Sequence, residues 1–273
     1  DASIITEALS GRDEHDSTSS FREVESYMPT SIDGLKGKRI AIIKEIVDSL
    51  KNEEVKKLFL ASTDAMKKAG AIVEEVEFGT DALESIYATY IVISCAEATS
   101  NDANLDGIKF GPYYEGKSYQ EVMYNARTKG FSELIKRRFV IGSFALMREN
   151  QDVLFLRAQR NRAKIVAKAN EILRDYDAFI APSAPGIAPL FEGSSDKLSD
   201  EYLIADNHMA IGNFGGFPSI TLPMGFVEEM PVGINFTSAP WSEKKILDIS
   251  KAYEDITGLK GLSVNNRKGG NLQ

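Results

Sequence analysis

Asp206 is the acidic residue whose setting most favours ligand binding. It lies in an apolar stretch in which Leu203, Met209 and Ala210 would share its face of a helix. A carboxylate on an apolar face costs free energy unless a cation meets it. The stretch ends at Gly215-Gly216 and leads into a strand, so the acid lies near a helix-to-strand corner, where α/β proteins often bind ligands. We predict that Asp206 binds a cationic group.

A matching cation interrupts an apolar helical run. Arg137 and Arg138 lie between Leu134-Ile135 and Phe139-Val140-Ile141, and periodicity alone does not say which arginine points inward. A guanidinium can hold a carboxylate through two parallel hydrogen bonds, and a carboxylate can take an ammonium group. An arginine together with Asp206 could therefore bind both ends of a zwitterion. The alternative is a buried structural ion pair.

Composition limits the classes of function. The chain has 273 residues, of which 43% are hydrophobic, so it can bury a sizeable core as one large or two modest domains. A net charge of −8 argues against binding of nucleic acid by this chain without a partner. Cys95 is the single cysteine, which excludes an internal disulfide and suits a reducing, cytoplasmic setting. No apolar run is long enough to cross a membrane.

Alternating strand and helix patterns predict an α/β fold with three parts. Residues 1–37 form a polar connecting segment, 38–260 the α/β core and 261–273 a frayed tail. A helix over 53–68 between strands over 39–44 and 72–78 predicts a parallel strand-helix-strand unit. The remaining expected elements are helices over 81–100, 119–129, 132–150, 152–176 and 242–257, and strands over 178–181, 219–223 and 232–237.

Several stretches resemble one known family. The C-terminal signature of amidase signature enzymes is similar to Asn213–Pro218, Pro223–Phe226 and Pro231–Asn235. Asp13–Ser19, Ala96–Asn101 and Ile135–Gly142 resemble one branch of that family, the A subunits of tRNA-dependent amidotransferases. This resemblance implies a mixed β-sheet covered by helices on both faces, of which the chain would supply the C-terminal portion.

The family resemblance also implies what is missing. Amidase signature enzymes act through a lysine, a serine in a cis peptide and a nucleophilic serine, all in a Gly/Ser-rich segment that would lie upstream of Asp1. Nothing in the chain reads as that segment, since Ser17–Ser20 has no neighbouring glycine. We therefore expect no catalytic residue here, an inactive fragment, and a sheet edge or apolar face that the N-terminal catalytic half would cover.

Site roles follow from the same resemblance. It selects Arg138, which would bind the α-carboxylate of glutamine, while Asp206 would bind the α-ammonium group. Tyr90 is the best match for a tyrosine that lines the pocket, and Tyr87 is the second choice. The small neighbours of Arg138, among them Gly142, would let the guanidinium approach its ligand.

The implied function is that of the glutaminase component of a tRNA-dependent amidotransferase. It would hydrolyse glutamine to supply ammonia for converting Glu-tRNA(Gln) or Asp-tRNA(Asn) to Gln-tRNA(Gln) or Asn-tRNA(Asn). Subunits B and C would be its partners, misacylated tRNA would be met only through the complex, and ATP and magnesium would bind to one of those partners. Two alternatives are a stand-alone amidase acting on a small amide and a non-catalytic binding or scaffold domain.

Other chemistry receives little support. His15 and His208 are far apart in the sequence and lack carboxylates at ligand spacing, so we predict no metal site and place His208 on a helix surface. No Gly-x-Ser-x-Gly elbow is present, which argues against a Ser-His-Asp hydrolase. Ser183 is interpreted as a strand-end loop residue and Cys95 as a small core residue.

Overall fold

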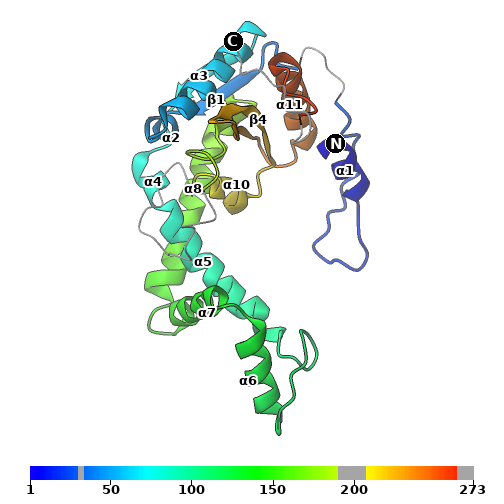
Figure 1. Cartoon of the computed structure of the whole chain (residues 1–273), viewed down its shortest axis with the longest axis vertical. Helices are drawn as coiled ribbons and strands as arrows, with labels where there is room; N and C mark the ends of the chain where they lie inside the picture. Colours follow the sequence, from blue (N-terminus) through cyan, green and yellow to red (C-terminus); the bar gives the residue numbers. More distant parts are fainter. Residues whose placement is uncertain (30–33, 190–206, 263–273) are drawn as a thin grey trace. The chain divides into compact units, whose positions relative to one another are not determined.

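The computed structural model describes residues 1–29, 34–189 and 207–262, and these form two compact units (Figure 1). The first unit contains the described residues of 1–83, 165–189 and 207–262. The second contains residues 84–164. The boundary that follows the second unit falls within helix α8, Arg157–Asp175.

A five-stranded mixed sheet forms the centre of the first unit. Its order is β2-β1-β3-β5-β4. Strand β1 pairs in parallel with β2 and β3, whereas β5 pairs antiparallel with β3 and β4, which confirms the predicted parallel unit and the mixed sheet. The strands are β1 (Arg39–Ile43), β2 (Ile72–Val76), β3 (Ala178–Pro182), β4 (Ser219–Val227) and β5 (Met230–Thr237).

Apolar side chains are buried on both faces of this sheet. Helices α3 (Glu53–Lys68) and α11 (Glu243–Thr257) pack over one face, where the rings of Phe236 and Tyr253 lie 5.3 Å apart. Strand side chains alternate between faces, so Ala41, Ile43 and Phe179 point to the other side, and they too are buried. The second half of α8 contributes four buried residues at helical spacing, Ile165, Ala169, Ile172 and Leu173.

Local signals explain why the elements of the first unit were predictable. Helix α3 begins after Asn52, whose side chain accepts hydrogen bonds from the backbone N–H groups of Glu54 and Val55. Its predicted bounds are confirmed. Short elements complete this unit: α1 (Ala2–Leu9), α2 (Lys44–Asp48) and α10 (Ala210–Gly215), with α4 (Thr80–Glu84) at the boundary.

The second unit is helical. It contains α5 (Ile86–Asn101), the short 3₁₀ helix η1 (Asp102–Asn104), α6 (Tyr119–Gly130), α7 (Glu133–Leu146), the π-helix η2 (Asp152–Leu156) and the start of α8. Serine side chains cap α6 and α7 at Ser118 and Ser132. The predicted helix over 132–150 is too long, because the chain turns extended at Met147.

Candidate functional site

Helices α5 and α7 of the second unit pack closely enough to bring two predicted site residues together. A Cβ atom added to Gly142 of α7 would lie 2.0 Å from the carbonyl oxygen of Cys95 in α5. The hydroxyl of Thr99 donates to that same carbonyl at 2.8 Å and lies 3.3 Å from the carbonyl oxygen of Phe139 in α7. Gly142 therefore admits the backbone of α5, and its expected role in letting a ligand approach Arg138 stays a prediction.

Arg138 lies one helical turn before this contact and meets Tyr90. Its Nη1 atom donates a long hydrogen bond of 3.5 Å to the Tyr90 hydroxyl. This bond raises the pKa of Arg138, while desolvation acts in the opposite direction. Arg138 and Tyr90 are half-buried, whereas Arg137 is exposed. The structure thus shows that Arg138, and not Arg137, points from α7 towards α5.

The guanidinium of Arg138 has no carboxylate partner within residues 1–29, 34–189 and 207–262. The guanidinium nevertheless stays charged, because the hydrogen bond to Tyr90 outweighs the desolvation. The arrangement can therefore hold an anionic group beside a phenol hydroxyl. Asp206, the predicted second half of the clamp, lies outside the described residues, and so does its relation to Arg138.

The chain that follows Asp206 differs from its prediction in two respects. A turn at residues 208–209 precedes α10, so the described part of this stretch is not one continuous helix. His208 is 4% exposed, which makes the prediction of a surface histidine wrong. The predicted stop at Gly215-Gly216 is confirmed, with Gly216 in the left-handed region at φ 64°.

Cys95 is a core residue, as predicted. It is completely buried between α5 and α7, and this burial raises the pKa of its thiol despite the nearby charge of Arg138. A thiol of raised pKa carries little thiolate at neutral pH and is a poor nucleophile.

Serine chemistry is also unsupported in the described part of the chain. The Ser183 hydroxyl lies over Gly233, where an added Cβ atom would be 2.6 Å from it. Nearby on β4 and β5, Asn235 donates to the hydroxyls of Ser219 and Thr221. Asn235, Ser219 and Thr221 are thus bonded to one another, and among the described residues Ser183 has no hydrogen bond to a histidine or lysine.

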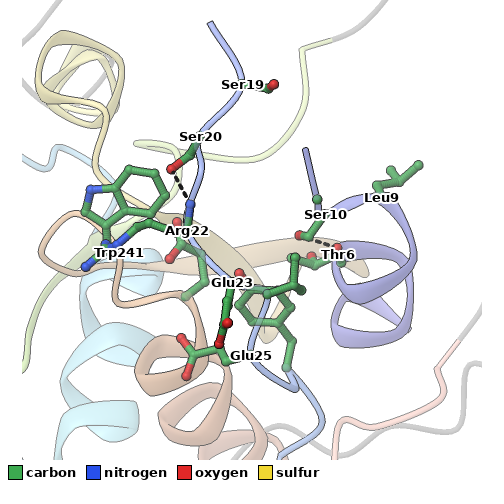
Figure 2. A pocket seen from close by; sticks show the side chains of 13 residues that line it. Thr6, Leu9, Ser10, Ser19, Ser20, Arg22, Glu23, Glu25 and Trp241 are labelled. Carbon is green, nitrogen blue, oxygen red and sulfur yellow. Dashed lines mark hydrogen bonds between the residues drawn. The ribbon is translucent and has the colours of Figure 1, made fainter. Parts of the chain in front are cut away.

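A separate hollow opens beside α1 in the first unit. Figure 2 shows Arg22 against Trp241, with Glu23 and Glu25 close by, and the guanidinium carbon lies 4.4 Å from the centre of the indole ring. The hollow has a volume of about 540 Å³. Ser10, at its rim, donates to the backbone carbonyl of Thr6 at 2.6 Å. These groups include no paired nucleophile and base, so the hollow is not a candidate active site.

Metal and membrane sites are not evident in the portion that the structure describes. There, no three His, Cys, Asp or Glu side chains gather closely enough to hold a metal ion. None of the described helices has the length and apolar character that a membrane crossing requires.

Comparisons with known proteins found a matching family model and similar relatives. A family model described as Amidase matches residues 1–247. The chain is 36% identical over 265 residues to the A subunit of glutamyl-tRNA(Gln) amidotransferase from Agathobacter rectalis, covering 95% of this chain and 52% of that protein. The corresponding protein of Thermotoga maritima is 34% identical over 254 residues, covering 93% and 52%. The chain therefore spans about half the length of these curated relatives.

Solved structures share the fold. The crystal structure of the Thermotoga maritima protein matches with a TM-score of 0.69 and 30% identity, covering 93% of this chain and 50% of that one. A native peptide amidase from Stenotrophomonas maltophilia matches with a TM-score of 0.66 over 93% of this chain and 50% of that one. At 22% identity, this second likeness concerns the fold alone.

Proposed function

Because the chain belongs to the amidase family, we propose that it is the C-terminal part of the glutaminase component of a tRNA-dependent amidotransferase. Two relatives, each named as the A subunit of a glutamyl-tRNA(Gln) amidotransferase, support the proposal at 36% and 34% identity over nearly all of this chain. The contact between the half-buried Arg138 and Tyr90 is the observation in the molecule that carries it.

The proposed role of the site is to bind the head group of glutamine. Arg138 takes the α-carboxylate, which supplies the anion that this half-buried guanidinium lacks among the described residues. Tyr90 orients Arg138 and lines the pocket, and Asp206 takes the α-ammonium group. Holding both charged ends fixes the distance from the head group to the side-chain amide, which is how a binding site orients a substrate for attack.

The remaining parts of the reaction lie outside this chain in our proposal. The half of the relatives' length that the chain does not span would bring the lysine and serines that form and hydrolyse the acyl-enzyme. Subunits B and C would receive the ammonia and use ATP and magnesium to amidate Glu-tRNA(Gln) or Asp-tRNA(Asn). The complex would work in the cytoplasm. The present chain alone would not release ammonia from glutamine.

The test uses a full-length protein that contains this chain. We expect Arg138→Ala to raise KM for glutamine and to lower kcat/KM by about tenfold to a hundredfold, because a charged hydrogen bond is lost. Arg137→Ala removes the exposed neighbouring charge and serves as the matched control. Tyr90→Phe should have a smaller effect in the same direction.

A small amide without an amino-acid head group separates head-group binding from a general loss of structure. Its hydrolysis should fall much less in Arg138→Ala than glutamine hydrolysis does. Equal losses on both substrates, or an unchanged KM for glutamine, would show that Arg138 does not bind the head group.

A further inference from the structure

A cavity in the second unit lies between α5 and the start of α8, and the described residues that line it include cations but no acidic side chain. Its volume is about 550 Å³, within the range of roughly 300–1,000 Å³ that small-molecule sites occupy. Neither Arg138 nor Tyr90 lines it. We propose that this cavity binds a small organic phosphate at a site distinct from the glutamine site.

The charge comes from one face of α8. Arg157, Arg160 and Lys164 are spaced at i, i+3 and i+7, so their side chains share one face of the helix. All three are exposed. Within the described ranges Arg157 and Lys164 have no ion pair, while Arg160 pairs with Asp152 at 2.6 Å, outside the cavity lining. The whole chain has a net charge of −8, so this cluster is a local concentration of positive charge on an acidic protein.

The floor of the cavity is held by hydrogen bonds between the two helices. The side-chain amide of Asn161 in α8 donates to the hydroxyls of Ser85 and Thr89, both at 2.8 Å. These bonds fix the helix faces that carry the cations and the opposite wall. The cavity is therefore built by the fold rather than left between loose side chains.

Apolar groups complete the lining and indicate an organic ligand. Val92 of α5 lines one side, and Val153 and Leu154 of the π-helix η2 line another. Short π-helical turns are frequent at functional sites. With Arg160 paired to Asp152, the cations Arg157 and Lys164, unpaired among the described residues, remain over about 10 Å of helix. Two positive charges exceed what a single carboxylate needs, whereas a phosphate offers three acceptor oxygens and more charge. An apolar wall beside such a cluster suits a phosphate that is attached to an organic group.

Titration calorimetry on the full chain tests this assignment with adenosine 5′-monophosphate as the probe. Adenosine and inorganic phosphate, tested separately, represent its two halves. We expect saturable binding of the nucleotide, weaker binding of phosphate and none of adenosine. The double variant Arg157→Ala/Lys164→Ala should bind the nucleotide at least about tenfold more weakly, through the loss of charged hydrogen bonds.

Arg148→Ala is the matched control, because Arg148 is an exposed arginine of the same unit that does not line the cavity. The affinity of the Arg148→Ala variant for the nucleotide should equal that of the wild-type chain. If the double variant fails to fold, as judged by circular dichroism, Lys164→Gln alone removes one charge at an exposed position and should still weaken binding.

Three results would overturn the assignment. The first is the absence of saturable nucleotide binding, and the second is an equal loss of affinity in Arg148→Ala. The third is binding of a single-stranded RNA that depends on Arg157 and Lys164 while the mononucleotide does not bind, since that pattern would make the face a surface for extended polyanions.

Discussion

The hydroxyl of Tyr253 is a buried polar group, and its ionisation makes the stability of the core depend on pH. It donates to the hydroxyl of Ser62 at 2.9 Å, and both residues are completely buried. We expect Tyr253→Phe to lower the free energy of unfolding at neutral pH by about 1–2 kcal/mol, because the buried Ser62 hydroxyl loses its partner. Chemical denaturation of the two proteins measures this difference.

The same residue predicts a change of stability at high pH. Burial raises the pKa of Tyr253 to about 12, from a usual value of 10. A raised pKa in the folded state means that the stabilisation is fully present below pH 10 and is lost as the pH rises to about 12. The advantage of the unchanged chain over Tyr253→Phe should therefore shrink between these values. Tyr119→Phe, at an exposed tyrosine, should show no such convergence.

At the residue scale, the sequence could predict charge and apolar character better than orientation. It identified Cys95 as a core residue, but the choice between Arg137 and Arg138 needed a family resemblance. The choice is physically decided by the packing of α7 on α5, which periodicity cannot resolve in a helix with apolar residues on most sides. His208 was misplaced because a turn at residues 208–209 interrupts the helical spacing assumed for it.

At the element scale, Gly142 controls how closely α5 and α7 approach. Alanine normally stabilises a helix relative to glycine, but here its methyl group would overlap the carbonyl oxygen of Cys95. We expect Gly142→Ala to lower the free energy of unfolding by about 1–3 kcal/mol, the usual cost of overpacking. Thermal unfolding followed by circular dichroism measures it.

Gly130→Ala is the control for this prediction. Gly130 ends α6 in the same unit, and an added Cβ atom there would meet only Pro112, at 3.8 Å. This variant should be neutral or slightly stabilising. If Gly142→Ala behaved in the same way, the close approach of α5 and α7 would not constrain that position.

The hairpin between β4 and β5 contains an unfavourable turn. Val227 pairs with Met230, so Glu228 and Glu229 form a two-residue turn, and their φ angles are 48° and 63°. Left-handed conformations cost about 1 kcal/mol or more for residues with a side chain, and Asn-Gly suits this turn. We expect Glu228→Asn/Glu229→Gly to raise the free energy of unfolding by about 1 kcal/mol.

The control for the hairpin removes both charges but leaves residues with a Cβ atom at the two positions of positive φ. Glu228→Ala/Glu229→Ala should fail to stabilise the chain in the same denaturation experiment, since alanine has no preference for positive φ. Stabilisation by both pairs of substitutions would instead point to repulsion between the two carboxylates.

Helices with strong periodicity and capping residues were predictable, whereas the points at which a predicted helix is interrupted were not. Helix α3 matches its predicted bounds because Asn52 caps it and one face is apolar. The predicted helix over 81–100 is divided at Ser85, and the helix expected from residue 152 opens as a π-helix. Both interruptions border the cavity lined by Asn161. At Ser85 the side chain accepts a tertiary hydrogen bond from Asn161, which the local sequence could not reveal.

At the scale of the whole molecule, the sheet of the first unit ends at two unlike edges. The β2 edge carries Glu74 and Glu75, and Arg39 pairs with Glu74 at 2.9 Å. The β4 edge carries uncharged residues, with Ser219, Thr221 and Pro223 exposed. Charged side chains protect an edge strand from pairing with another chain, as do proline and β-bulges. In β4 the register shifts after Pro223, which has no backbone N–H, so the part of this edge that remains open to pairing is Ser219–Leu222.

We expect this chain, when purified alone, to associate through β4. No strand of the described residues pairs with its outer edge, and the chain spans about half the length of its relatives. Light scattering after size exclusion should show a mass that rises with concentration.

Thr221→Lys should shift the population towards monomer, because it places a charge on the β4 edge, while Asn235 keeps its bonds to Ser219 and the Ile220 carbonyl. Glu75→Gln changes the net charge by the same +1 at the β2 edge and should leave the mass unchanged. A monomer at every concentration, or equal shifts in both variants, would show that association does not proceed through β4.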